Sequence, residues 1–502
     1  MLEPLKLMAA VEESKVREAA ISSIRDVVAN LPDEHLNLHF VPFVVDLAKK
    51  EWFTSRTSAL ALIHVGFERL KQEDKESLTT IFLQLCLDDT PTVRRAAAQN
   101  FYPFANKLKS TELSKDFVSS LQSLMSDDQD SVRINAVSSC MQLSKVLSTT
   151  SFSAQVLPLV ASAVVDASWR IRWSVANHLH ILFVSFHGDK SMVDKLLVVY
   201  SDLLSDSESE VRAAALATVD AVCKHLGKEQ IVNSIFPQLR RIANDSSEVA
   251  RASLANVLNN ISETLGKDAT VETLLPLLLL FLRDESPDVR LNIIAKLDKL
   301  SNVIGVQLLS QSLIPAITEL SKDSKWRVRS SVIENVPMLL EHLGKALYQE
   351  KLNDMYFGWM KDAVWSVRKV TASKLPSFVH VFGEEWTVAE ILPQIEKMRQ
   401  DSSHMNRSTA VYCFEILLPS FSCDTYAKHV VPLLLLAAKD AVPNVRLNAV
   451  RALENFLRLH GGGRAKGGAE AVGAFETLSL DSDKDVRYFA KKALTEFHSN
   501  KK

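Results

Sequence analysis

The seven residues Asp323-Ser-Lys-Trp-Arg-Val-Arg329 contain the two marks that decide the fold, an aspartate and, six residues later, an arginine. The arginine returns every 38 to 41 residues along the chain, at Arg17, Arg56, Arg94, Arg133, Arg172, Arg212, Arg251, Arg290, Arg329, Arg368, Arg407, Arg446 and Arg487. The aspartate precedes the last eleven of these, at Asp88, Asp127, Asp166, Asp206, Asp245, Asp284, Asp323, Asp362, Asp401, Asp440 and Asp481. A fixed period in this range indicates a solenoid of stacked repeats.

Each repeat is predicted to be a pair of helices. After Arg290 the apolar residues recur at helical spacing up to Gly305, where a left-handed residue is expected to end the helix. Before the next repeated arginine, Arg329, apolar residues around Pro315 share one face of another helix, with the proline at a kink or in the first turn. The six residues 323–328 are expected to form the loop between the two helices. Because neither helix can bury its apolar face alone, the sequence predicts one all-α superhelical solenoid of about thirteen helix pairs over residues 1–502.

Composition excludes several classes of protein. The chain is 47% apolar and 24% charged, and its net charge of −2 comes from interleaved acids and bases, which argues against a nucleic-acid-binding protein. The longest apolar run, 274–282, is too short to cross a bilayer, so no membrane insertion is expected. The start of the chain shows no signal peptide, and the five cysteines form no CxxC pair. We therefore expect reduced thiols and a cytoplasmic protein, with the nucleus as a second compartment.

The sequence contains no pattern typical of catalysis. It has no phosphate-binding loop, no HExxH, no GxSxG and no metal-spaced group of histidines and cysteines. We expect no enzymatic activity, no catalytic residue, no metal site and no cofactor.

The repeated arginine allows two interpretations. A cation in the first turn of a helix opposes the helix dipole, so its recurrence implies a partner. A carboxylate that bridges to the arginine or the backbone N–H groups of the next repeat would give a structural ladder, and this interpretation is favoured over a ligand-binding role.

Tryptophans recur at the loop that carries these marks, and they are the candidates for binding. They occur at Trp52, Trp169, Trp326 and Trp365. Each could cap the core, but four on one edge favour binding anchors, because Trp and Arg dominate interface hot spots. The glycine-rich stretch 461–468 coincides with the 41-residue interval, and a hinge is expected there.

Several segments resemble one HEAT-repeat family, the scaffold (A, 65-kDa regulatory) subunits of protein phosphatase type 2A. They are Trp52-Phe-Thr-Ser-Arg-Thr-Ser58, Asp88-Asp-Thr-Pro-Thr-Val-Arg-Arg-Ala-Ala-Ala98, Leu309-Ser-Gln-Ser-Leu-Ile-Pro-Ala-Ile317 and Lys325-Trp-Arg-Val-Arg329. The resemblance implies a non-catalytic scaffold whose first copy corresponds to the third repeat of the family, so that the first two repeats are lacking. It also implies that residues 1–300 bind an exchangeable B-type regulatory subunit, and that residues 301–502 bind the phosphatase catalytic subunit.

The same resemblance implies which residues make these contacts. The catalytic-subunit edge would use Trp326, Arg327, Trp365, His404, Met405, Val442, Asn444, Lys484 and Asp485. The regulatory edge would use Trp52, Phe53, Pro91, Arg94, Arg95, Asp128, Asp130, Trp169 and Arg170. The alternative is a HEAT-repeat nuclear transport receptor or another adaptor, although such receptors are usually longer and more acidic.

Overall fold

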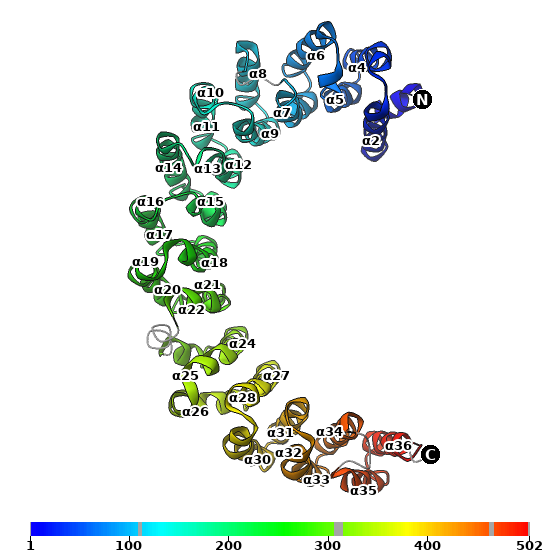
Figure 1. Ribbon diagram of the computed structural model, residues 1–502, viewed down its shortest axis with the longest axis vertical. Helices are drawn as coiled ribbons and strands as arrows, with labels where there is room; N and C mark the ends of the chain where they lie inside the picture. Colours follow the sequence, from blue (N-terminus) through cyan, green and yellow to red (C-terminus); the bar gives the residue numbers. More distant parts are fainter. Residues whose placement is uncertain (1, 109–112, 306–314, 461–465, 500–502) are drawn as a thin grey trace. The chain divides into compact units, whose positions relative to one another are not determined.

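The computed structural model describes residues 2–108, 113–305, 315–460 and 466–499, and all regular structure in these ranges is helical. The chain divides into two compact units, Met1–Leu265 and Gly266–Lys502. Within each unit the helices follow one another in pairs, as Figure 1 shows. We call the first helix of a pair the A helix and the second, which carries the repeated arginine, the B helix.

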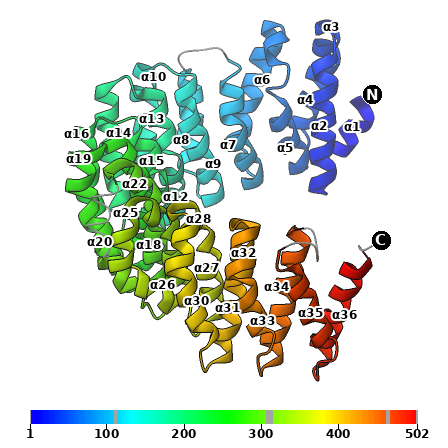
Figure 2. The same cartoon turned by 60° about the horizontal axis from the view of Figure 1, so that its bottom comes forward.

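Unit 1 contains seven pairs. The A helices are α1 (Leu2–Ala9), α3–η1–α4 (Asp33–His35, Leu36–Phe40, Val41–Ala48), α6 (Gln72–Leu85), α8 (Lys115–Met125), α10–α11 (Thr149–Gln155, Leu157–Val164), α14 (Lys190–Leu204) and α16–η4–α17 (Lys228–Gln230, Ile231–Ile235, Phe236–Ile242). The B helices are α2 (Ser14–Asn30), α5 (Phe53–Leu62, followed by η2, Phe67–Arg69), α7 (Pro91–Ala105), α9 (Asp130–Gln142, followed by η3, Leu143–Lys145), α12–α13 (Trp169–His178, His180–Phe186), α15 (Ser209–Cys223) and α18 (Glu248–Leu265). Neighbouring helices α6 to α9 lie side by side (Figure 2).

Unit 2 continues the same pattern. Its A helices are α19–η5–α20 (Lys267–Ala269, Thr270–Leu274, Leu275–Phe281), the helical residues 315–320, α26 (Asn353–Trp359) with the end of α25, α29–η6–α30 (Glu384–Trp386, Thr387–Ile391, Leu392–Arg399), α32–α33 (Cys423–His429, Val431–Ala437) and α35 (Gly468–Leu478). Its B helices are α21–α22 (Pro287–Ile294, Leu297–Ile304), α24 with the start of α25 (Trp326–Glu334, Val336–Lys351), α27–α28 (Trp365–Ser373, Leu375–Phe382), α31 (His404–Leu417, followed by η7, Leu418–Ser420), α34 (Pro443–His460) and α36 (Lys484–Ser499).

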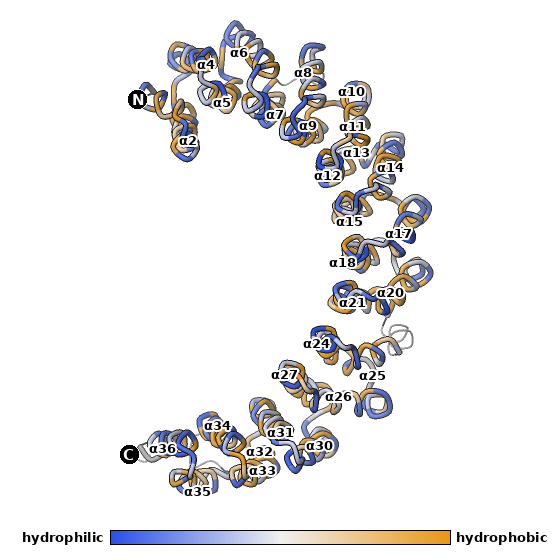
Figure 3. The backbone as a smooth tube through the Cα atoms, turned by 180° about the vertical axis from the view of Figure 1, so that it is seen from behind, coloured by the Kyte–Doolittle hydropathy of each residue, from blue (hydrophilic) through white to orange (hydrophobic). Residues whose placement is uncertain are grey.

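The repeated arginine is the fourth residue of its B helix in all thirteen copies. In many copies the residue before it faces the core: Val93, Val132, Val211, Val289 and Val328 are each fully buried. Hydrophobic and hydrophilic residues alternate along the helices instead of gathering in one segment (Figure 3). Each B helix packs on the next B helix of its unit, as α7 does on α9 and α24 on α27, and B helices such as α9 and α31 also pack on their own A helices, α8 and α30. This confirms the predicted all-α fold of stacked helix pairs.

Prolines mark a break in many A helices. Pro42, Pro237, Pro276 and Pro393 each lie in the first turn of an α-helical segment that follows a π-helical segment. A proline has no N–H to donate to the preceding turn, and the wider π turn accommodates the interruption. The expected kink or first-turn position is therefore found in these repeats, and Pro315 begins the described part of its own helix.

Glycines end several B helices with a backbone that other residues rarely adopt. Gly305 has the expected positive φ of 80°, and Gly266 and Gly383 have φ values of 77° and 90°. Their ψ values, 178° at Gly266 and 162° at Gly383, lie outside the left-handed helical region, so a left-handed cap is the wrong description for these two. This combination of φ and ψ is accessible almost only to glycine.

The last helix pair packs directly on its neighbours. The expected hinge at 461–468 lies partly outside the described residues. Its described end shows Gly467 in the left-handed region with φ 77°, next to α35. α35 contacts α33 and α34, and α36 contacts α34, so this pair is held in the same stack as the others of unit 2.

The glycine geometry yields a stability test. Gly383→Ala should destabilise unit 2 by roughly 1–3 kcal/mol, because alanine is strained at this backbone conformation even though open space surrounds the position. Urea unfolding followed by circular dichroism measures the effect. Gly358→Ala is the matched control, since Gly358 lies inside α26 with equally open surroundings and should gain helix propensity. Equal stability of the two variants would contradict the assigned role of Gly383.

Candidate functional site

Each repeated arginine closes its own A–B turn and links it to the following one. In the example of Arg329, Nη1 donates to the carbonyl oxygen of Asp323, at the start of its own turn, over 2.6 Å. Nε and Nη2 donate to the two carboxylate oxygens of Asp362, in the next turn, over 2.7 and 2.8 Å. Asp362 also accepts the backbone N–H of Val364 over 2.8 Å. One arginine and one aspartate thereby fix two successive turns.

This link recurs along both units. In unit 1 the pairs are Arg56–Asp88, Arg94–Asp127, Arg133–Asp166, Arg172–Asp206 and Arg212–Asp245, at 2.7, 2.5, 3.0, 2.7 and 2.7 Å. In unit 2 they are Arg290–Asp323, Arg329–Asp362, Arg407–Asp440 and Arg446–Asp481, at 2.9, 2.7, 2.7 and 2.7 Å. The predicted ladder is confirmed, with a correction of direction: the carboxylate accepts from the arginine of the preceding repeat and from N–H groups of its own turn.

The ladder is interrupted at two described positions. Arg17 donates to the carbonyls of Val11 and Glu12, and the position where the partner aspartate would stand holds Lys50. Arg368 keeps the bond to its own turn, but its Nε donates to Thr409 Oγ1 over 3.1 Å. Asp401 instead pairs with Lys361 at 3.6 Å. The sequence marks at Arg368 and Asp401 are in register, so only the structure reveals this exception.

The pKa is lowered at four of the ladder aspartates, Asp127, Asp206, Asp440 and Asp481. Burial opposes ionisation of Asp206, but hydrogen bonds from Arg172 and from the Glu208 N–H outweigh it, so the pKa lies below its ordinary value. At Asp481 the hydrogen bonds from Arg446 are the largest influence and lower the pKa. Burial lowers the pKa of Arg368, whereas the bond to Asp440 raises that of Arg407.

The candidate residues of unit 1 lie at successive A–B turns. Trp52 is the N-cap of α5, Pro91 and Asp130 are the first residues of α7 and α9, and Trp169 and Arg170 begin α12. The tryptophans were expected in loops, but the structure places Trp169 in a helical first turn and Trp52 at its edge. The Trp52 and Phe53 rings lie 5.5 Å apart, and the Arg170 guanidinium lies 4.9 Å from the Trp169 ring.

Some candidates of unit 1 are engaged in the ladder. Arg94 bonds Asp127 and also Asp128, at 2.9 Å, and its side chain is only 16% exposed. Asp130 pairs with Arg133 at 2.6 Å and accepts a hydrogen bond from Ser168 Oγ. Arg95, by contrast, is exposed on the same turn as Arg94. The structure therefore assigns a scaffolding contact to Arg94 and leaves Arg95 available to a partner.

The candidate residues of unit 2 also share consecutive turns. Trp326–Arg327 and Trp365 begin α24 and α27, and His404–Met405 begin α31. Val442 and Asn444 flank the start of α34, and Lys484–Asp485 begin α36. The contacts of α24 with α27 and of α27 with α31 make the first three turns neighbours.

The two tryptophans of unit 2 differ in their surroundings. Trp326 is half-buried, with the Arg327 guanidinium 4.9 Å from its ring. Trp365 is 45% exposed, although it packs edge-on against Tyr412 and Arg368 lies 5.3 Å from its ring. A tryptophan that only capped the core would be buried, so this exposure favours the binding interpretation for Trp365.

Three exposed apolar residues at the turns escaped the sequence reasoning. Leu87, Val165 and Leu480 are 63%, 77% and 83% exposed, and each directly precedes a ladder aspartate. Their position in the repeat could have identified them as exposed, because an apolar residue at the end of an A helix, next to the aspartate, lies on the turn.

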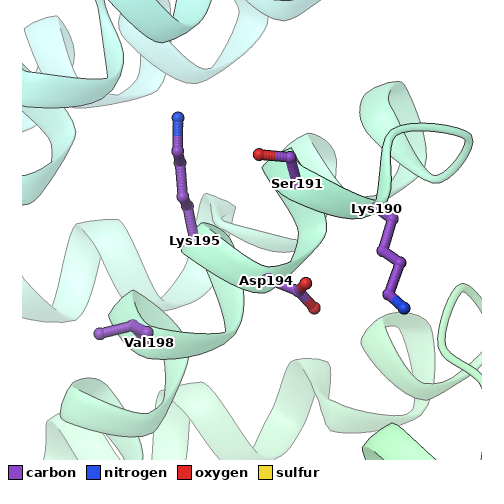
Figure 4. Close-up of a pocket in the computed structure, with 5 residues that line it drawn as sticks. All are labelled: Lys190, Ser191, Asp194, Lys195 and Val198. Carbon is purple, nitrogen blue, oxygen red and sulfur yellow. The ribbon is translucent and has the colours of Figure 1, made fainter.

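A surface depression along α14 is lined by Lys190, Ser191, Asp194, Lys195 and Val198. Its two lysines point to different sides of the helix (Figure 4). Lys195 donates to Ser153 Oγ over 3.2 Å. Groups that diverge in this way cannot act together on one substrate atom.

The described residues contain no group of three or more His, Cys, Asp or Glu placed to hold a metal ion. None of their helices is long and apolar enough to cross a membrane. The most distinctive surfaces of the structure are thus the two series of A–B turns.

Comparison with known proteins gives the class of the chain. Residues 190–266 match the PPP2R1A-like HEAT repeat family. Among solved structures, Kap95p in a complex with RanGDP matches with a TM-score of 0.66 at 13% identity, covering 100% of this chain and 67% of that one. Kap121p bound to the extreme C-terminus of Cdc14p matches with a TM-score of 0.62 at 15% identity, covering 100% and 54%. The chain is a HEAT-repeat protein, and the likeness to the karyopherins shows the fold alone.

Sequence relatives narrow the class further. The PP2A regulatory A subunit of Schizosaccharomyces pombe is 38% identical over 178 residues, 35% of this chain and 30% of that protein. Its counterpart of the same name from Saccharomyces cerevisiae is 35% identical over 207 residues, 39% and 33%. A probable PP2A regulatory subunit of Caenorhabditis elegans is 42% identical over 147 residues, 29% and 25%. Segments of the chain are thus similar to the PP2A regulatory A subunits, and the matched segments span a quarter to a third of these relatives.

The contribution of the ladder to stability can be tested by removing one of its arginines. Arg329→Ala should destabilise unit 2 by roughly 1–3 kcal/mol, because it leaves the carboxylate of Asp362 without its charged donor. Urea denaturation measures the loss. The matched control is Arg327→Ala, two residues away, whose exposed guanidinium forms no ion pair with any residue that the structure describes. If both variants unfold at the same urea concentration, the ladder is not a source of stability in this repeat.

The lowered aspartate pKa values predict acid sensitivity. A group whose pKa is lower in the folded state stabilises the fold above its unfolded pKa of about 3.9, and the contribution is lost as the pH falls through the folded value. Asp206→Asn should therefore reduce stability at pH 7 and flatten the loss of stability below about pH 4. Thermal unfolding between about pH 2 and 7 tests this. Asp202→Asn, at an exposed position of the same repeat, should leave the profile unchanged.

Proposed function

We propose that the chain is the non-catalytic scaffold of a type 2A Ser/Thr protein phosphatase. Its A–B turns within residues 301–502 hold the catalytic subunit, and those within residues 1–300 hold a B-type regulatory subunit. The observation that carries the proposal is the exposure of Arg327, Trp365, His404 and Met405 at three successive turns of a chain whose segments are similar to the PP2A regulatory A subunits. Cytoplasmic and nuclear location is part of the same proposal.

Within a turn, the residues that stabilise the fold differ from the residues that are exposed to a partner. The fourth residue of a B helix, the arginine, is engaged in the ladder, and the third is buried in the repeats named above. Exposed side chains such as Arg327, His404 and Met405 lie among the first two residues of their helices. Binding residues can therefore vary from repeat to repeat without disturbing the contacts that fix the turns.

The transport-receptor alternative has support from the fold alone. The likeness to Kap95p and Kap121p is at 13% and 15% identity, while the PP2A regulatory A subunits match at 35% or more over their segments. A pull-down from native extract separates the two functions: a phosphatase catalytic subunit supports the scaffold, and Ran in its place supports the receptor.

Paired tryptophan variants test the assignment of the two edges. Trp326→Ala with Trp365→Ala should weaken binding of the purified PP2A catalytic subunit by about a hundredfold or more, since buried tryptophan anchors contribute about 2 kcal/mol or more each. Isothermal titration calorimetry measures the affinity. Circular dichroism checks the fold, because Trp365 also packs on Tyr412.

The matched control makes the same change in unit 1. Trp52→Ala with Trp169→Ala should leave binding of the catalytic subunit unchanged and weaken binding of a B-type regulatory subunit. If a folded Trp326/Trp365 variant binds the catalytic subunit as tightly as the unchanged chain does, the assignment of this edge is refuted.

A further inference from the structure

A groove on unit 1 is lined by hydroxyl groups and a cation. It lies between α10 and the first turns of α14, the starts of two successive A helices, and has a volume of about 340 Å³. The A–B turns are at the opposite ends of these A helices. The hydroxyl groups are those of Thr149, Thr150, Ser153 and Ser191, the cation is Lys195, and Asp189 contributes a carboxylate.

The cation of this groove has no carboxylate partner. Lys195 is exposed and forms no ion pair with the residues that the structure describes, and its Nζ donates across the groove to Ser153 Oγ over 3.2 Å. The two acids nearest in sequence are used elsewhere: Asp189 caps the start of α14, and Asp194 accepts a hydrogen bond from Gln230. An ammonium group has three donors, so one hydroxyl acceptor leaves Lys195 able to bind an anion as well.

Ser191 is placed to carry that anion. It is exposed and is the second residue of α14. Figure 4 shows Ser191 and Lys195 on one side of the helix, whereas Lys190 and Asp194 point to the other side. Residues four apart are neighbours on a helix surface, and an anion one turn before a lysine is the favourable order.

The other three hydroxyl groups of the groove lack this combination. Thr149 and Ser153 are only partly exposed, and Thr150 is exposed but has Ala154 one turn later. Among the four, an exposed hydroxyl and a lysine one turn later occur together at Ser191.

We propose that Ser191 is a phosphorylation site and that Lys195 holds the phosphate group. A protein kinase supplies the group from ATP. Ser191 Oγ forms the new bond to the γ-phosphorus, the bond from that phosphorus to the bridging oxygen breaks, ADP leaves and the hydroxyl proton is released. Phosphoserine carries up to two negative charges and three acceptor oxygens. Lys195 binds one of these oxygens and keeps its hydrogen bond to Ser153.

The phosphate ties two successive repeats together. α11, which continues α10, contacts α14, and the Lys195–Ser153 hydrogen bond already joins the starts of the two A helices. Hydrogen bonds between an ammonium and a phosphate are stronger than those between neutral groups. Phosphorylation therefore stiffens this step of unit 1. The site is independent of the proposed scaffold contacts, because it lies away from the A–B turns.

Phosphoserine installed at position 191 of the full chain tests the role of Lys195. The second pKa of the phosphate should lie below its usual value of about 6, because the nearby cation favours the dianion. Phosphorus NMR measures this pKa. The phosphate should also raise the midpoint of thermal unfolding by about 2–4 °C. In the Lys195→Gln chain the pKa should return toward about 6, and the rise in the midpoint should be lost.

Ser131 provides a matched control. It is also exposed and the second residue of a long helix, α9, but Asn135 stands one turn later. Phosphoserine at position 131 experiences a helix N-terminus without a lysine partner, so its pKa should not change with Lys195→Gln. If the phosphate at position 191 has the same pKa and the same effect on unfolding with and without Lys195, the proposal is overturned.

A second measurement asks whether kinases use the site. The full chain is incubated with native extract and ATP, and mass spectrometry locates the phosphate. We expect phosphate at Ser191 of the unchanged chain and none on the corresponding peptide of the Ser191→Ala chain. An extract that phosphorylates other residues of the chain but leaves Ser191 unmodified would also overturn the proposal.

Discussion

The two-pronged bond from a repeated arginine to the aspartate of the following turn is the constraint on which the rest of each unit depends. An exposed ion pair contributes little, because water competes for both partners. Here the geometry is different, since both carboxylate oxygens are engaged and the side chains of Arg329 and Asp362 are only 13% and 11% exposed. The third arm of the guanidinium binds the carbonyls of its own turn, so that one side chain fixes a turn and its spacing from the next.

This bond also explains how a cation can recur in the first turn of a helix. The helix dipole disfavours a positive charge there. The arginine offsets that cost with carbonyl oxygens on one side and a carboxylate on the other, as Arg446 does with Asp440 and Asp481. The aspartate also accepts a hydrogen bond from the backbone N–H of the residue two positions later, as Asp481 does from Asp483. Hydrogen bonds therefore hold both the start and the end of the turn.

Because hydrogen bonds fix the turns, the residues that stabilise a turn are distinct from the residues exposed on its surface. The ladder arginine is the fourth residue of its B helix, and in many copies the third is a buried valine such as Val328, while residues such as Arg327, His404 and Met405 at the first two positions remain on the surface. Unit 1 and unit 2 therefore share one architecture, yet they carry different side chains at the same positions. Exposed Asp128 and Glu208 at turns of unit 1, and exposed Lys325 and Arg327 at a turn of unit 2, illustrate how a repeat fold acquires different surfaces without changing its core.

The sequence by itself determined the repeat, the all-α helix pairs, the arginine–aspartate partnership and the turns at which the candidate residues lie. It could do so because a fixed period makes equivalent residues occupy equivalent places, and helical spacing is a local property. Only the tertiary structure decided which carboxylate each arginine takes, because that choice depends on side chains from two repeats at once. Arg368 turns to Thr409 although Asp401 stands in register. Contacts between repeats also decide three further features: Trp365 is exposed, Trp326 lies in a helix instead of a loop, and Arg94 forms an ion pair with Asp127. No single repeat contains all the residues that make these contacts.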